Sequence, residues 1–187
     1  GNNDKIPFSI NDIVNKPISI YATSKISNEL MSYTYSHLFG LQTIGLRYFT
    51  VYGPWGRPDM SYYIFCEKIK SGRPITVYNH GNLHRDFTFI DDIIDGTKAA
   101  INKTYKCEVF NLGNNKSENI MEIIRLIENS MGKKAIINYE DSQPGDVSHT
   151  YADIDYSQKK LGYDPKTKIS EGIPKFIKWY NTYNNHS

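Results

Sequence analysis

An almost uninterrupted apolar run at residues 41–49 follows directly on a helical pattern that ends at Gly40. Runs of this kind are typical of strands buried on both faces of a parallel sheet, because helices cover both sides of such sheets. The preceding helical pattern extends over about residues 19–39, and glycine commonly follows the last helical residue. Its apolar stripe consists of Ile26, Leu30, Tyr33 and Leu38.

The rest of the chain alternates between helical and extended patterns with long loops between them. Helices are expected at about 60–70, 90–103, 117–131, 156–161 and 169–183. Strands are expected at 75–78, 109–112 and 135–139, an extended segment at 85–89, and a loop at 50–59. This order predicts an α/β fold in which the tail of a doubly wound parallel sheet precedes a smaller mixed domain. So few strands would leave bare edges, which suggests that a first half is missing.

Tyr21 and Lys25 are four residues apart in the run Tyr-Ala-Thr-Ser-Lys, so they share one helix face. The lysine ammonium favours the phenolate, which would let the tyrosine act as a base. Such a pair suits hydride transfer at a carbinol carbon, where tyrosine takes the hydroxyl proton. The alternative is an ordinary helix with a surface lysine and a half-buried tyrosine.

A glycine-rich phosphate loop is absent from the sequence. Neither Gly-x-Gly-x-x-Gly nor Gly-x-x-Gly-x-x-Gly occurs among the 187 residues. The loop that holds a dinucleotide's pyrophosphate is therefore missing from this chain.

Composition excludes several classes of function. The net charge of +2, with scattered basic residues, does not indicate nucleic acid or a membrane surface. Cys66 and Cys107 lie far apart in apolar contexts, as buried thiols of a reducing compartment do. The five histidines form no ligand-spaced cluster, so no metal is expected. No secretory or membrane-spanning run occurs, and we expect a cytoplasmic protein.

Several segments occur in the order found in extended short-chain dehydrogenases that act on nucleotide sugars. After Tyr21 and Lys25 come Arg-Tyr-Phe-Thr-Val-Tyr-Gly-Pro at 47–54 and Arg-Asp-Phe-Thr-Phe-Ile-Asp-Asp at 85–92. Three further segments are Tyr-Gly-Pro-Trp-Gly-Arg-Pro-Asp-Met at 52–60, Val-Tyr-Asn-His-Gly at 77–81 and Gln-Pro-Gly-Asp-Val at 143–147. With these segments the chain resembles the UDP-glucuronate 4-epimerases of the NAD-dependent epimerase/dehydratase family.

The resemblance implies the carboxy-terminal part of a Rossmann-type doubly wound sheet plus a smaller mixed α/β substrate-binding domain. Residues 1–59 would be the tail of the NAD-binding domain, whose first half is absent. Residues 60–187 would mainly bind the nucleotide sugar, with some segments returning to the Rossmann sheet. The chain would thus be a carboxy-terminal fragment, inactive alone.

The implied reaction inverts C4 of a UDP-uronic acid, converting UDP-glucuronate to UDP-galacturonate through a 4-keto sugar. NAD is the implied cofactor, with Tyr21 as catalytic base and Lys25 binding the nicotinamide ribose and favouring the phenolate. Tyr48 and Phe49 would complete the cofactor-binding set.

For the substrate, Thr50 and Arg57 are candidates to hold the uronate carboxylate and so suppress loss of CO₂ from the keto acid. Thr50 could instead cap the loop, and Arg57 could be a surface arginine. Arg85 resembles the arginine that binds the diphosphate, with a salt bridge to Asp86 or Asp91 as the alternative. The remaining implied substrate residues are Asp59, Met60, Thr76, Tyr78, Gln143 and Asp146.

Thr76 and Tyr78 match the strand that holds uracil, and Asp146 matches the residue that binds the nucleotide ribose. Gln143 stands where many relatives have an arginine, so the diphosphate would meet one charge fewer.

Two rival functions remain open. One is a UDP-glucuronate decarboxylase or a sugar 4,6-dehydratase; the other, of a different class, is a non-catalytic nucleotide-sugar-binding fragment. Family members are commonly homodimers through the helix that carries the Tyr/Lys pair, here at 19–39, and serve capsule or lipopolysaccharide synthesis.

Overall fold

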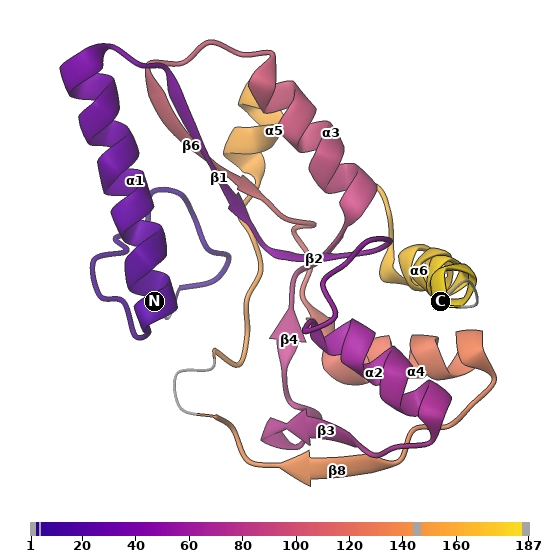
Figure 1. Cartoon of the computed structure of the whole chain (residues 1–187). Helices are drawn as coiled ribbons and strands as arrows, with labels where there is room; N and C mark the ends of the chain where they lie inside the picture. The colour runs from indigo at the N-terminus through magenta and orange to yellow at the C-terminus, as the bar shows by residue number, and fades with distance from the viewer. Residues whose placement is uncertain (1–2, 4, 144–146, 185–187) are drawn as a thin grey trace.

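The computed structural model describes residues 3, 5–143 and 147–184 and shows a mixed α/β arrangement, as expected (Figure 1). The helices are α1 (Ile20–Phe39), α2 (Ser61–Ser71), η1 (Asn79–Gly81), α3 (Ile90–Ile101), α4 (Ile120–Met131), α5 (Asp155–Leu161) and α6 (Ile169–Asn184). The strands are β1 (Thr43–Tyr48), β2 (Thr50–Tyr52), β3 (Ile75–Tyr78), β4 (His84–Arg85), β5 (Phe87–Phe89), β6 (Cys107–Leu112), β7 (Glu118–Asn119) and β8 (Ile137–Glu140).

Strands β1 and β6 form a parallel pair between α1 on one side and α3 with α5 on the other (Figure 1). On the α1 side, Arg47 forms a two-pronged ion pair with Glu29, at 2.7 and 2.8 Å. On the other side, Phe110 and Leu112 of β6 are fully buried among residues of α3 and α5. Helices therefore flank both sides of this pair, as the apolar run predicts.

The boundaries of α1 follow from local chemistry. The Ser19 hydroxyl accepts a hydrogen bond from the backbone N–H of Ala22, and Gly40 ends the helix with φ of 67°. The predicted apolar stripe, in contrast, is largely exposed in this chain, and Leu30 and Leu38 are each 64% exposed. Exposed leucines on this scale favour contact with further protein.

Two expectations for residues 41–59 were wrong. The strand β1 is only half-buried, and among the described residues it pairs with β6 alone, so its other edge is not covered by a strand. The expected loop at 50–59 begins with a short strand, β2, which pairs in parallel with β5. The Gly and Pro content of residues 50–59 favours a loop. The segment nevertheless starts as a strand, because β2 pairs with the distant β5 and Tyr52 at its end is buried.

A second hydrophobic cluster surrounds Tyr52 and joins α2, α4 and α6 to strands β3 and β5. The Tyr52 ring meets the rings of Tyr62 and Phe87 edge-on, with centroids 6.2 Å apart in each case. A Cβ added to Gly172 of α6 would lie 2.1 Å from the Tyr52 hydroxyl oxygen, so only glycine fits there. This packing holds β2 and α2 beside β3.

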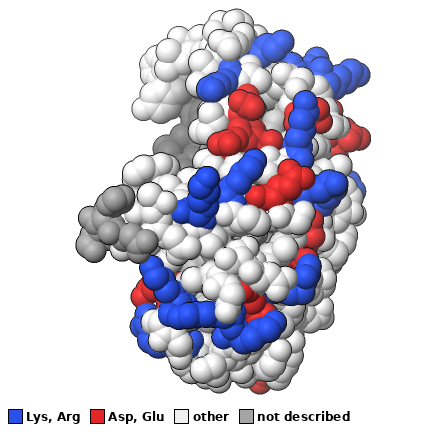
Figure 2. Space-filling view, turned by 90° about the vertical axis from the view of Figure 1, so that its right-hand side faces the viewer, with Lys and Arg blue, Asp and Glu red and all other residues white. Residues whose placement is uncertain are grey.

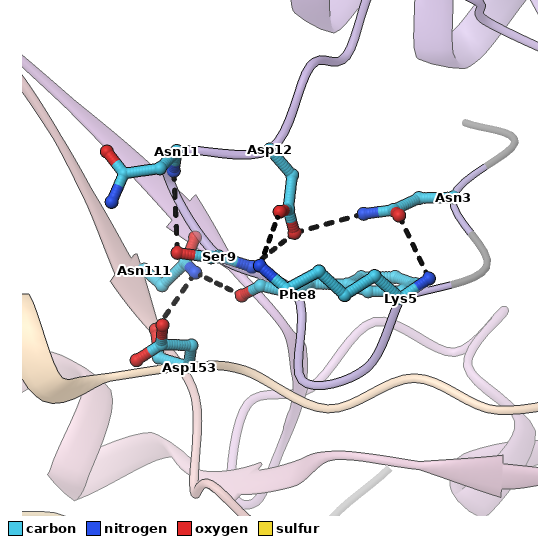
Figure 3. Close-up of polar contacts among 8 residues, drawn as sticks. All are labelled: Asn3, Lys5, Phe8, Ser9, Asn11, Asp12, Asn111 and Asp153. Atoms are coloured by element: carbon cyan, nitrogen blue, oxygen red, sulfur yellow. Dashed lines mark hydrogen bonds and ion pairs between the residues drawn. The ribbon is translucent and has the colours of Figure 1, made fainter.

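The amino-terminal segment lies along β6 through the side chain of Asn111 (Figure 3). The Asn111 amide donates to the carbonyl oxygens of Phe8, at 2.8 Å, and Asp153, at 3.0 Å. Asp12 closes the local turn by accepting from the Ser9 N–H, and this bond holds the pKa of the Asp12 carboxyl below its usual value. The described residues before α1 form a loop with one isolated bridge, between Phe8 and Ala152.

Acidic and basic side chains alternate over the face drawn in Figure 2, without a large patch of one sign. No helix in the described part of the chain is long and apolar enough to cross a membrane. Among the same residues, no three His, Cys, Asp or Glu side chains are grouped to hold a metal. Cys66 and Cys107 are free thiols, and burial raises the pKa of Cys66.

The Asp86 carboxylate, between β4 and β5, is fully buried and accepts four hydrogen bonds. The donors are the backbone N–H groups of Asn114 (2.6 Å), Asn115 (3.1 Å) and Ala152 (3.0 Å) and the Thr88 hydroxyl (2.9 Å). Burial raises the pKa of Asp86, and these four bonds oppose the shift. One side chain thus joins the strand segment 84–89 to two distant parts of the chain.

We expect Asp86→Asn to lower the free energy of unfolding by about 2–4 kcal/mol, because an amide nitrogen would face N–H donors left without an acceptor. Urea denaturation of the purified protein measures the change. Asp91→Asn, at an exposed position in the first turn of α3, is the matched control. Equal stability of the two variants would contradict a structural role for the Asp86 carboxylate.

Candidate active site

A pocket of about 460 Å³ opens between α2, β3 and β4. Five of the residues singled out from the sequence line it: Thr50, Met60, Thr76, Tyr78 and Arg85. They come from four separate segments of the chain, which the second hydrophobic cluster brings together. Ligand sites in proteins are typically pockets of this size with mainly apolar walls and a few polar groups.

Strand alternation explains the positions of Thr76 and Tyr78. Ile75 and Val77 are buried in the core, while Thr76 and Tyr78, two residues apart, are half-buried. Thr50 begins β2, and its backbone N–H donates to the carbonyl oxygen of Asp86 at 3.0 Å. Its side chain lines the pocket, so the position offers a hydroxyl to a ligand.

Arg85 lies on β4, next to the buried Asp86. Its Nη1 donates to the carbonyl oxygen of His84 at 3.0 Å, and the side chain lines the pocket. A salt bridge between Arg85 and Asp86 was the alternative. Both carboxylate oxygens of Asp86 instead accept from other donors, the backbone N–H groups of Asn114 and Ala152 among them. Arg85 therefore brings a positive charge to the pocket wall.

Arg57 and Asp59 lie outside the pocket lining. They form an exposed ion pair of 3.3 Å on the loop before α2. The Arg57 guanidinium also lies 3.7 Å from the sulfur of Met60, which does line the pocket. The loop therefore borders the pocket, but neither charged group faces into it in this structure.

Tyr21 and Lys25 share one face of α1, as their spacing predicts, and the lysine Nζ lies 5.1 Å from the centre of the tyrosine ring. Tyr21 is 72% exposed, and neither residue lines the pocket. Tyr52 and Tyr62, in contrast, are buried; burial raises the pKa of Tyr52, and it raises the pKa of Tyr62 to about 12. Both buried phenols therefore stay protonated at neutral pH, whereas the Tyr21 hydroxyl is accessible to a ligand.

The predicted cofactor residues Tyr48 and Phe49 also lie outside the pocket. The Tyr48 and Thr97 hydroxyl oxygens are 3.1 Å apart, which ties the end of β1 to α3. The Phe49 N–H donates to the carbonyl oxygen of Leu112, and its ring lies 6.5 Å from that of Phe8. Both residues therefore lie at the carboxyl ends of β1 and β6, where α/β sheets commonly bind cofactors.

Of the two predicted substrate residues near the carboxy terminus, Gln143 and Asp146, the structure describes only Gln143. Gln143 is exposed and has no regular secondary structure. Asp146 lies outside the described residues.

Two residues at this site were missed by the reasoning from sequence. One is Asp86, considered only as a possible partner of Arg85. The other is Lys68, which lines the pocket together with Ser61, Ile64 and Phe65 of the same helix. The spacing 61, 64, 65 and 68 defines one helix face and could have identified Lys68.

The fold is a Rossmann-like α/β arrangement with the pocket around Thr50 and Arg85 beside it. The model of the NAD dependent epimerase/dehydratase family matches residues 1–113, and the chain belongs to that family.

Two curated relatives and one solved structure illustrate the similarity. An uncharacterized protein of Methanocaldococcus jannaschii is 53% identical over 180 residues, covering 96% of this chain and 55% of that protein. UDP-glucuronate 4-epimerase 4 of Arabidopsis thaliana is 41% identical over 200 residues, covering 98% of this chain and 46% of the relative. The chain thus spans about half the length of these relatives.

The solved structure is a variant of UDP-glucuronic acid 4-epimerase from Bacillus cereus, in complex with UDP-4-deoxy-4-fluoro-glucuronic acid and NAD. It superposes with a TM-score of 0.90 at 33% identity, over 97% of this chain and 58% of that one. The Rossmann-like fold expected from the sequence is therefore confirmed.

Proposed function

We propose that this chain carries the UDP-sugar pocket and the Tyr/Lys pair of an NAD-dependent nucleotide-sugar 4-epimerase that acts on a UDP-uronic acid. The observation that carries the proposal is the gathering of Thr50, Met60, Thr76, Tyr78 and Arg85 around one pocket. The resemblance to uronate 4-epimerases implies the same five residues as contacts of the substrate. Similarity to proteins named UDP-glucuronate 4-epimerase supports the same substrate.

Residues that could bind NAD lie near the carboxyl ends of β1 and β6. The exposed phenol and ammonium of Tyr21 and Lys25 are groups that can meet a nicotinamide ribose. Tyr48 and Phe49 lie where β1 ends and could border the same ligand. When bound, the nicotinamide ring supplies the acceptor and later the donor of the C4 hydride.

The residues of this chain would move the proton and hold the sugar. Tyr21 takes the proton of the C4 hydroxyl as the keto sugar forms, and returns it after the sugar has turned to present its other face. Lys25, whose ammonium lies 5.1 Å from the centre of the Tyr21 ring, would bind the nicotinamide ribose beside that tyrosine.

Substrate recognition is divided among the pocket residues. Arg85 would bind the diphosphate, and the backbone around Thr76 with the ring of Tyr78 would hold uracil. Thr50 lines the pocket, and its hydroxyl would donate to the uronate carboxylate and hold it in an orientation that disfavours loss of CO₂. Arg57 would have to leave its ion pair with Asp59 to take part. We assign Gln143 to the diphosphate of the substrate and Asp146 to its nucleotide ribose.

The chain alone would bind a UDP-sugar without turning it over, which is a second candidate function for the isolated 187 residues. The pocket favours binding, whereas the glycine-rich loop for the cofactor's pyrophosphate is absent from the sequence. In this proposal residues 1–59 continue an NAD-binding domain, and residues 60–187 mainly form the substrate domain. Residues 90–112 and 152–163 return to the β1–β6 unit, where they form the hydrophobic cluster around Phe110 and Leu112.

An NMR time course of UDP-glucuronate with the full-length gene product and NAD tests the proposed reaction. We expect UDP-galacturonate to form without release of CO₂. Formation of UDP-xylose or a UDP-4-keto-pentose would instead identify a decarboxylase, and no turnover of any UDP-uronate would refute the proposal.

We expect Tyr21→Phe to lower kcat by about 10²–10⁴-fold, because the proton acceptor at the C4 hydroxyl is lost. The KM for the UDP-sugar should stay within a few-fold, since the pocket that binds the nucleotide is untouched. Tyr35→Phe removes a hydroxyl from another exposed tyrosine of α1 and should leave kcat unchanged. Full activity of Tyr21→Phe would rule out the assigned base.

We also propose that α1 forms a homodimer interface in the full-length protein, because its exposed Leu30 and Leu38 form part of an apolar stripe. The double variant Leu30→Glu, Leu38→Glu should convert a dimer to a monomer in sedimentation velocity. Asn28→Glu adds a negative charge to the polar face of the same helix and serves as control. A dimer that survives the double variant would place the interface elsewhere.

A further inference from the structure

Lys68 is a basic residue of the pocket to which the proposed function gives no role. It belongs to the face of α2 that also presents Ser61, Ile64 and Phe65 to the pocket. The residue is half-buried. Lysine commonly packs its apolar stem against neighbours and keeps its ammonium accessible, so the charge can meet a ligand in the pocket.

The acidic residue adjacent to Lys68 on α2 has another partner. Glu67 pairs with Arg73 at 2.6 Å. Within the described part of the chain, no hydrogen bond or ion pair engages the Lys68 ammonium. The protein around the pocket therefore leaves this charge without a counterion.

The pocket lining contains two basic residues, Lys68 and Arg85, and no aspartate or glutamate in the described residues. Glu118 lies opposite Arg85 in the β4–β7 register, but it is not part of the lining. Most of the other lining residues are apolar, and apolar walls strengthen the attraction between a charge and its ligand. The Lys68 ammonium against these walls would favour an anionic ligand.

Helix geometry directs Lys68 toward the pocket end at which α2 begins. Side chains on a helix lean toward its amino terminus, so Lys68 extends over the turn that carries Ile64. Met60 is the N-cap residue there and makes no side-chain hydrogen bond to the first turn. The first-turn N–H groups favour negative charge at the end of the pocket where α2 begins, and the Lys68 side chain leans toward that end.

We propose that Lys68 binds a phosphate group of the substrate's nucleoside diphosphate and is the second cation of the pocket beside Arg85. This assignment rests on the proposed nucleotide-sugar substrate. Lysine suits the role because its ammonium binds phosphate as a compact point charge on a flexible stem.

Isothermal titration of the full-length gene product with UDP, UMP and uridine tests the proposal. We expect Lys68→Met to weaken UDP binding about tenfold, the loss typical of one charged hydrogen bond, and to leave uridine binding within twofold. Lys68→Arg should restore most of the UDP affinity. Lys98→Met removes an equal charge at an exposed position of α3, outside the pocket, and should bind UDP as the unaltered protein does.

Unchanged UDP affinity in Lys68→Met would overturn the proposal. An equal loss of affinity for uridine and for UDP would overturn it too, because Lys68 would then contact the base or maintain the shape of the pocket. Failure of the unaltered protein to bind UDP would overturn it as well.

The test also separates this proposal from the proposed reaction. A protein that binds UDP but turns over no UDP-uronate refutes the reaction, while the comparison of UDP with uridine still decides the role of Lys68. Where turnover is measurable, Lys68→Met should raise KM about tenfold and leave kcat unchanged, as loss of uniform binding does.

Discussion

The buried carboxylate of Asp86 is the interaction on which the arrangement of this site depends. A carboxylate is costly to bury unless its oxygens are hydrogen-bonded, and here four donors satisfy them. Those donors include N–H groups from segments 28 and 66 residues away in the chain. The bonds hold the short strands β4 and β5 in one position, and Arg85 lies immediately before Asp86. The charge offered to the pocket is therefore carried by a rigid element.

The packing around Tyr52 complements this polar centre. The edge-on contacts of Tyr52 with Tyr62 and Phe87 connect β2, α2 and β5, and Gly172 leaves room for the Tyr52 hydroxyl. Aromatic pairs of this kind stabilise a core beyond the area that they bury. Because β2 begins at Thr50 and α2 follows Met60, the same contacts set the distance between two walls of the pocket.

Reasoning from sequence found the local part of the site and missed the part that depends on distant contacts. Thr76 and Tyr78 followed from the resemblance to uronate 4-epimerases, and strand alternation then places both on one side of β3. Asp86 was missed because its partners are backbone groups, which leave no mark in the amino-acid pattern. Lys68 was missed because a lysine on an amphipathic helix usually faces solvent, and only the position of β3 and β4 against α2 makes it part of a pocket.

The sequence by itself determined the α/β class, the ends of α1 and the shared face of Tyr21 and Lys25. These features depend on neighbours within a few residues, such as the Ser19 cap, the left-handed Gly40 and the helical repeat. The tertiary structure alone decided that β2 is a strand, that Asp86 is a buried acceptor and that two cations share one pocket. Each of these depends on contacts between segments far apart in the chain, and such contacts exist only after the whole chain has packed.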